Sequence, residues 1–183
     1  CGIPGSGGAY IRPGFLLRSL VVGGTGSRSD LVDHPDEPPV RYEAGTPNVP
    51  GVRALSVGAT FAARRISDPL ATRDVERRFK TVIDGLETIH GVRVFCAVDG
   101  ARTPVVSFTV SGFDSTEVAL ILYDSWGIVV RPGLHCAPSI HRALGTYPTG
   151  TVRVSLSWFT TDEDVQLLLS AVDRIASAKG GSI

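Results

Sequence analysis

The apolar pattern between residues 69 and 89 is the feature that limits the fold of this 183-residue chain most tightly. Apolar side chains recur there at spacings of four, three, four and three residues, at Val75, Phe79, Val82, Leu86 and Ile89. Such spacing places them on one face of a helix, and that face needs a partner surface to bury it. Asp68 followed by Pro69 predicts the start of this helix, because aspartate caps helix N-termini and proline suits the first turn.

Several other segments predict strands. Residues 92–96 and 104–110 are rich in β-branched and apolar side chains, and residues 128–130 form a short apolar run. In residues 151–157, polar and apolar side chains alternate, which is typical of a strand with one buried face. The apolar face is formed by Val152, Val154 and Leu156. A further short strand is expected at 8–12, ahead of a Pro-Gly turn.

Three more helices complete the expected fold. One covers residues 50–66, a second begins with a capping box of Asp114 and Glu117, and a third begins with Thr160 and Glu163. Burying their apolar faces against the strands predicts an α/β chain. Its expected form is an α+β two-layer sandwich, with helices packed on a small and largely antiparallel sheet.

Composition and charge argue against several classes of protein. The 18 basic and 18 acidic side chains cancel and form no basic run, which argues against nucleic-acid binding. The longest apolar run, at 15–22, is too short to span a bilayer. Three cysteines without regular spacing argue against a disulfide framework and favour a cytoplasmic setting. Because the chain has no methionine, we expect a processed N-terminus or a piece of a longer protein.

Cys136 is the candidate catalytic residue. It follows Arg131 in a loop rich in glycine and proline, and Arg153 follows on the polar side of a predicted strand. A thiol among positive charges can be held as the thiolate, the form that attacks electrophiles. Two guanidinium groups could also bind the carboxylate of a small substrate. The alternatives are a buried Cys136 that only packs in the core, and two solvated surface arginines.

Other candidate sites carry weaker signals. The segment 23–27 could cradle a phosphate through backbone N–H groups and hydroxyls, but it lacks the lysine of a P-loop. His135, Cys136 and His141 could suggest a metal, yet adjacent ligands converge poorly on one ion, so no metal site is expected. The two lysines, Lys80 and Lys179, are not placed for covalent cofactor chemistry.

Taken together, these segments resemble the cysteine desulfurase branch of the class V aminotransferases, which depend on pyridoxal phosphate (PLP). The resemblance covers nearly the whole chain, in the order found in the family. It is carried by Gly-Ser-Gly-Gly-Ala-Tyr-Ile (5–11), Gly-Gly-Thr-Gly-Ser (23–27), Arg-Tyr-Glu-Ala-Gly-Thr-Pro-Asn (41–48), Val-Arg-Pro-Gly-Leu-His-Cys-Ala-Pro (130–138) and Gly-Thr-Val-Arg-Val-Ser (150–155).

The resemblance implies a role for each matching residue. Cys136 would attack the sulfur of L-cysteine and become a persulfide, while Arg153 would hold the α-carboxylate. Gly24 and Thr25 would reach across a homodimer to the PLP phosphate of the neighbouring subunit, and Asn48 would lie near the active-site entrance. PLP would act as the electron sink. A sulfur-acceptor protein is a further implied partner.

The chain departs from the family in one respect: it does not contain the lysine that binds PLP. The resemblance would place this lysine just upstream of Cys1. The resemblance then makes residues 1–50 the end of the large PLP-binding domain with a dimer-interface segment. Residues 51–183 would be a linking helix and the small C-terminal domain of a fold type I enzyme. Activity is therefore expected of a longer parent. The alternatives are an aminotransferase or lyase without sulfur transfer, and an inactive truncated domain.

Overall fold

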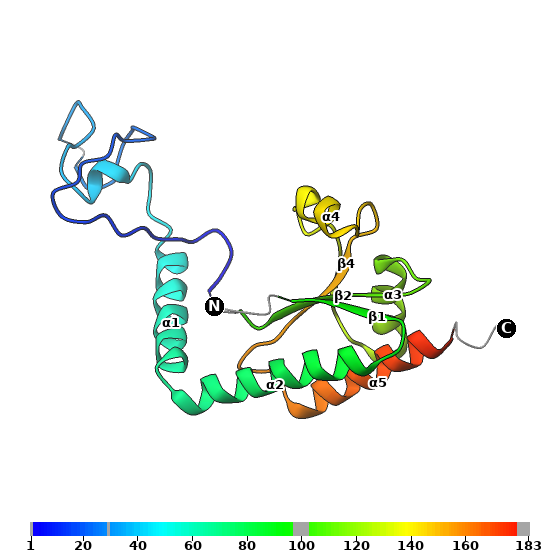
Figure 1. Ribbon diagram of the computed structural model, residues 1–183. Helices are drawn as coiled ribbons and strands as arrows, with labels where there is room; N and C mark the ends of the chain where they lie inside the picture. The colour runs from blue at the N-terminus through cyan, green and yellow to red at the C-terminus, as the bar shows by residue number, and fades with distance from the viewer. Residues whose placement is uncertain (1, 29, 97–102, 179–183) are drawn as a thin grey trace. The chain divides into compact units, whose positions relative to one another are not determined.

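The computed structural model describes residues 2–28, 30–96 and 103–178 (Figure 1). The chain divides into two units, residues 1–67 and residues 68–183. The expected boundary after residue 50, between the end of a large domain and a small domain, stays a prediction. In the structure, the helix that follows this boundary groups with the residues that precede it.

The first unit is mostly irregular up to its single long helix. Its regular elements, within the described residues, are the 3₁₀ helix η1 (Val40–Tyr42) and α1 (Val49–Ile66). The predicted strand at 8–12 is wrong: those residues form no ladder in the described part of the unit. A lone extended segment has no neighbouring strand to satisfy its backbone groups, so it stays irregular.

Hydrogen bonds with η1 hold the apolar segment 15–22 in place within this unit. The Tyr42 hydroxyl accepts a hydrogen bond from the Leu17 N–H at 3.0 Å, and Arg41 Nε donates to the Leu17 carbonyl at 3.0 Å. The Ser19 hydroxyl donates to the Arg41 carbonyl at 2.8 Å. These bonds stand in for the backbone pairing that an isolated segment lacks.

The second unit is built on a four-stranded antiparallel sheet in the order β1-β2-β4-β3. Its elements are α2 (Pro69–Thr88), β1 (Val92–Phe95), β2 (Val105–Val110), α3 (Ser115–Trp126), β3 (Arg131–Gly133), α4 (Pro138–Leu144), β4 (Thr151–Ser155) and α5 (Asp162–Ala178). Helices α2, α3 and α5 form a layer against the sheet (Figure 1). The expected two-layer α/β arrangement is confirmed.

The core lies between this sheet and its helices. Alternate residues of β2 are buried, and they pack with the α2 stripe and with apolar residues of α3 and α5. Burying one such large side chain contributes about 1.5–3 kcal/mol. The stripe expected from 75 to 86 is confirmed, as are the Asp68 cap and the Asp114 capping box. Cys96 packs against the core as a half-buried residue.

Three expectations for this unit are corrected. The strand expected at 128–130 lies at Arg131–Gly133, because an edge strand tolerates Pro132 where a central strand would not. The last helix is capped by Thr161 with Asp164, one residue later than expected. Helix α4 was not expected, since its apolar side chains form no buried stripe.

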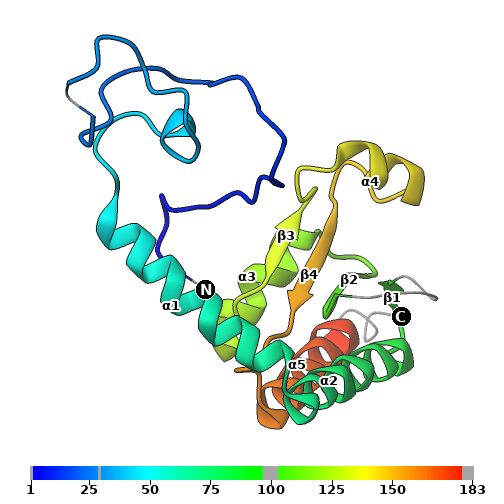
Figure 2. The same ribbon diagram turned by 90° about the vertical axis from the view of Figure 1, so that its left-hand side faces the viewer.

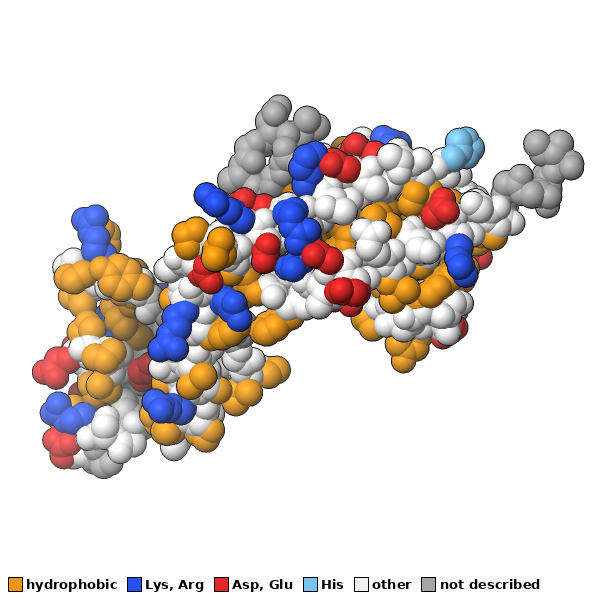
Figure 3. Space-filling model, turned by 90° about the horizontal axis from the view of Figure 1, so that it is seen from below, with side chains coloured by type: hydrophobic (Ala, Val, Ile, Leu, Met, Phe, Trp, Pro, Cys, Tyr) orange, Lys and Arg blue, Asp and Glu red, His pale blue; other side chains and the backbone are white. Residues whose placement is uncertain are grey.

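A charged cluster joins α2 to α5 on the outer side of the helical layer. Arg77 Nη2 lies 3.0 Å from Asp162 Oδ1, and Arg78 Nε lies 2.9 Å from the same oxygen. These hydrogen bonds, first from Arg77 and then from Arg78, lower the pKa of Asp162. Figure 3 views the molecule from the side of α2 and α5 and shows basic and acidic side chains mixed with hydrophobic ones. No helix in the described part of the chain is long and apolar enough to cross a membrane.

Candidate functional site

The loop that follows β3 presents Cys136 at the surface. The side chain is exposed, so the alternative of a core cysteine is wrong. Arg131 Nη2 donates a hydrogen bond to Cys136 Sγ at 3.7 Å. The backbone of His135 and of Cys136 has φ angles of 50° and 60°. Such left-handed conformations are unfavourable for residues with side chains and are found most often at functional sites.

Arg131 and Arg153 lie directly opposite each other across the β3–β4 ladder. Opposed residues of an antiparallel pair share one face of the sheet, so two like charges lie on the same face, and one of them, Arg131, contacts the thiol. Figure 2 shows β3 running alongside β4. Arg153 is half-buried, and its Nε is buried without a hydrogen-bond partner in the described structure. A pair of like charges with an unused donor is suited to bind an anion.

His135 precedes Cys136 in the same loop and contacts β4. Its Nε2 lies 3.1 Å from Oγ1 of Thr151, a residue that is only 1% exposed and is paired with Gly133. The other ring nitrogen, Nδ1, is buried and has no partner among residues that the structure describes. Burial lowers the pKa of His135, and the positive charge of Arg153 lowers it further. The ring is therefore neutral near pH 7.

His141 supports the same loop from α4. It is buried, and its Nδ1 lies 2.7 Å from the Thr146 hydroxyl. The rings of His135 and His141 lie 5.6 Å apart. On the sequence alone, these histidines were weighed as metal ligands, no metal site was expected, and no other role was assigned to them. The contact of His135 with Thr151 was missed, because it depends on strand register and on left-handed backbone.

Residue 150 brings β4 close to the end of β3. Gly150 has a φ of 72° and is buried. A Cβ atom at this position would lie 2.7 Å from Gly133 Cα and closer still to the Gly133 carbonyl group. Only glycine fits so close an approach of two backbones. This contact holds the base of the Cys136 loop against the strand that carries Arg153.

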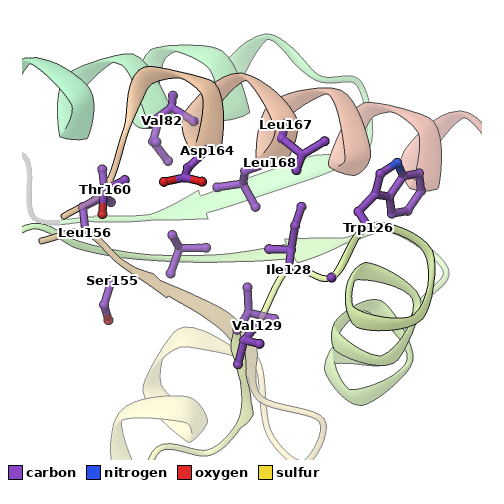
Figure 4. Close-up of a pocket in the computed structure, with 14 residues that line it drawn as sticks. Val82, Trp126, Ile128, Val129, Ser155, Leu156, Thr160, Asp164, Leu167 and Leu168 are labelled. Atoms are coloured by element: carbon purple, nitrogen blue, oxygen red, sulfur yellow. The ribbon is translucent and has the colours of Figure 1, made fainter.

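A separate pocket opens on the other side of the same strands (Figure 4). It has a volume of about 500 Å³ and is lined largely by apolar side chains, among them Val82, Trp126, Ile128 and Leu168. Asp164 points into it, but its Oδ2 already accepts a hydrogen bond from the Thr161 N–H at 2.8 Å. Neither Cys136 nor the two site arginines belong to its lining, so this pocket is not the candidate site.

The remaining candidate residues belong to the first unit. The Gly45 N–H donates to the Gly24 carbonyl at 2.7 Å, which joins segment 23–27 to segment 41–48. Thr25 is buried, and its Oγ1 lies 3.2 Å from Ser27 Oγ. Asn48 caps α1, and its Oδ1 accepts a hydrogen bond from Gly51 N at 3.1 Å. The structure does not place these residues relative to Cys136.

His34 also supports the glycine-rich segment. Its Nδ1 lies 3.1 Å from the Gly23 carbonyl oxygen, and its Nε2 lies 3.0 Å from that of Arg41. The contacts were not predictable, because they depend on the path of an irregular chain between residues 23 and 41.

The class-V aminotransferase family model matches residues 1–168 of the chain. The chain belongs to the class-V aminotransferase family. This match includes all the candidate residues described above. The family is PLP-dependent. The resemblance seen in the sequence is thereby confirmed at the level of the family.

Relatives of this class-V aminotransferase chain include cysteine desulfurases. It is 32% identical over 143 residues to a probable cysteine desulfurase of Xylella fastidiosa (strain Temecula1), covering 78% of this chain and 33% of that protein. The chain is 34% identical over 137 residues to cysteine desulfurase CsdA of Escherichia coli (strain K12). This match covers 74% of this chain and 32% of that protein. The chain therefore spans about a third of the length of these relatives.

A solved structure supports the fold. The apo cysteine desulfurase from Thermococcus onnurineus NA1 superimposes with a TM-score of 0.65 at 32% identity, covering 78% of this chain and 34% of that one. This similarity confirms the α/β fold that the sequence resemblance implied for the class-V aminotransferase chain.

The residues of segment 23–27 have the chemistry to hold the phosphate of PLP. The segment combines backbone N–H groups with two hydroxyls, and Cβ atoms at Gly23 or Gly24 would meet no atom within 4 Å. Open space therefore lies beside this backbone, as phosphate binding requires. Lys80 does not fit a covalent role, because it is exposed on α2 and lies 2.7 Å from Asp84. Lys179 lies outside the described residues.

Proposed function

We propose that this chain carries the sulfur-accepting thiol and the carboxylate clamp of a PLP-dependent cysteine desulfurase. The observation that supports this most is the exposed Cys136 thiol, hydrogen-bonded to Arg131, beside the opposed pair of Arg131 and Arg153. A nucleophilic sulfur next to an anion-binding pair suits a substrate that has both a carboxylate and an electrophilic sulfur. L-Cysteine is such a substrate once its carbon–sulfur bond is weakened.

Each of the three residues has a defined task. Arg153, with Arg131 beside it, binds the α-carboxylate and so fixes the substrate. The Cys136 thiolate attacks the substrate sulfur, and a sulfur–sulfur bond forms as the carbon–sulfur bond breaks. The bonding electrons stay with the carbon, which takes up a proton, so the products are alanine and a Cys136 persulfide. PLP, when bound, supplies the electron sink for this cleavage.

The first unit is assigned to the cofactor and to a second copy of the protein. We propose that Gly24 and Thr25 contribute to the PLP phosphate site across a homodimer, and that Asn48 lies near the substrate entrance. The apolar segment 15–22 supports a partner surface, since Leu16 and Leu20 are 69% and 96% exposed. Residues 1–50 would then belong to the large domain of a longer, cytoplasmic enzyme that passes its sulfur to an acceptor protein.

Detection of the persulfide tests this function. The PLP-loaded full-length protein would be incubated with L-cysteine, and the peptide that contains Cys136 would be analysed by mass spectrometry. We expect it to gain one sulfur atom as alanine is released. Cys136→Ala should abolish sulfur release, whereas Cys96→Ala, at a thiol packed against the core, should retain it. Full sulfur release by Cys136→Ala, or amino transfer to a keto acid without sulfur release, would contradict the proposal.

A further inference from the structure

Within the described part of the second unit, two buried polar atoms lack hydrogen-bond partners, and they belong to neighbouring side chains. They are Nδ1 of His135 and Nε of Arg153. Buried polar groups are almost always hydrogen-bonded, so two unsatisfied atoms in one place indicate that a ligand completes the site. The Arg153 Nε–H is a donor. The missing ligand must therefore offer an acceptor.

The contacts of the His135 ring indicate which nitrogen carries its proton. In the neutral form that the lowered pKa of His135 favours, only one of the two ring nitrogens is protonated. Its Nε2 faces the hydroxyl of Thr151, which can donate a hydrogen bond to an unprotonated nitrogen. Nδ1 has no hydrogen-bond partner in the described structure, and Arg153, whose charge lowers the pKa of the ring, does not pair with it. An unprotonated Nδ1 would be a natural acceptor for that guanidinium, so the absence of a bond favours Nδ1–H.

We propose that His135 is a second carboxylate-binding residue, whose Nδ1–H donates to one oxygen of the substrate acid group while Arg153 binds the other. This inference rests on the proposed function, because it assigns a further residue to the same substrate site. Thr151 is a positioning residue, which orients the ring through Nε2. The left-handed backbone of His135 and Cys136 places the donor and the nucleophile on consecutive residues. One short turn thus couples recognition of the acid group to attack on the sulfur.

A thiol probe with an acid group tests this assignment without any cofactor. In 3-(2-pyridyldithio)propionate, the electrophilic sulfur is separated from the carboxylate by two carbons, as in cysteine. The Cys136 thiolate attacks that sulfur, a new disulfide forms, and pyridine-2-thiolate leaves with the electrons of the broken sulfur–sulfur bond. The corresponding propionamide reacts by the same chemistry but has no carboxylate. The ratio of the two rates therefore measures carboxylate recognition separately from thiol reactivity.

The variants distinguish the two ring nitrogens. Asparagine places an N–H near the position of Nδ1, whereas glutamine reaches the position of Nε2. We expect His135→Gln to lower the acid-to-amide rate ratio about tenfold, as for loss of a hydrogen bond to a charged group. His135→Asn should keep a ratio near that of the wild type. The exposed His90, changed to Asn, is the matched control and should leave the ratio unchanged. Modification would be followed on the peptide that contains Cys136.

The outcomes separate this inference from the proposed function. If Arg153→Gln lowers the ratio but His135→Gln does not, His135 is not a carboxylate donor, while the arginine clamp stands. If neither variant lowers it, the clamp itself is wrong and the inference fails with it. If circular dichroism shows that His135→Gln does not fold, the acid-to-amide rate ratio of Thr151→Val tests the inference instead. That variant removes the hydroxyl that orients the ring and should lower the ratio, and an unchanged ratio would overturn the inference.

Discussion

Gly150 approaches Gly133 so closely that a Cβ atom at position 150 would lie 2.7 Å from Gly133 Cα. The contact is between two backbones, so a side chain could be accommodated only by moving β3 or β4. The loop that bears Cys136 begins at the end of β3, and Arg153 lies on β4. The geometry of the candidate site therefore depends on the absence of a side chain at position 150.

Gly150→Ala should destabilise the second unit by about 3 kcal/mol or more, since it combines a steric clash with a left-handed backbone. Urea unfolding followed by circular dichroism would measure this loss. Gly145→Ala is the matched control, because Gly145 has a φ of 71° but open space around it. Gly145→Ala should lower the free energy of unfolding by about 1–2 kcal/mol, which is the penalty of left-handed backbone alone. Equal losses in the two variants would show that the strands do not approach as described.

The backbone strain at Cys136 predicts an unusual response to glycine. Cys136→Gly should be more stable than Cys136→Ala by about 1 kcal/mol, because glycine adopts a φ of 60° without steric cost. The alanine variant is the correct reference, since both changes remove the thiol. Thermal unfolding of the two variants provides the comparison. A more stable alanine variant would mean that residue 136 is not held in the left-handed region.

The hydrogen bond from Arg131 to Cys136 Sγ predicts a change in thiol reactivity. A guanidinium that donates a hydrogen bond to the sulfur holds it in position for attack. Arg131→Gln should therefore slow alkylation of Cys136 by the neutral reagent iodoacetamide by about threefold to tenfold at neutral pH. Arg174→Gln, an exposed change on α5, should leave the rate at its wild-type value. An unaltered rate in Arg131→Gln would show that this guanidinium does not act on the sulfur.

The lowered pKa of His135 makes stability depend on pH. Burial lowers this pKa below the ordinary value of 6.5, and the electrostatic effects of Arg153, His141 and Arg131 lower it further. Below pH 6.5 the unfolded chain thus binds a proton that the folded chain does not, and the free energy of unfolding falls as the pH falls. This contribution is fully present above pH 6.5 and is lost on acidification toward the folded pKa. His135→Asn should remove this part of the pH dependence, as measured by urea unfolding at several pH values. An identical slope in both proteins would contradict the neutral ring.

The sequence predicted the helical layer well, because local signals determine it. The α2 stripe and the caps at Asp68 and Asp114 depend on residues close together in the chain. β3 and α4 were misplaced or missed. Pro132 interrupts the strand pattern, and α4 exposes Ile140 and Leu144 instead of burying them. β3 forms because β4 offers it a partner strand.

The candidate site was predictable only in part. Cys136, Arg131 and Arg153 were recognised from their residue types and from a family resemblance, and the ladder brings the two arginines together. The pairing of His135 with Thr151 required the register of Gly133 opposite Thr151, which no local pattern reveals. Positive φ values at two residues other than glycine were equally invisible in the sequence.

Pro132 has a consequence for the border of the sheet. β3 is the outermost strand next to β4, and proline has no N–H to offer a neighbouring chain. With only three residues and one of them proline, this strand is a poor template for intermolecular β-pairing. The residue that obscured β3 in the sequence thus also protects the open edge of the sheet, beside an exposed thiol, against unwanted association.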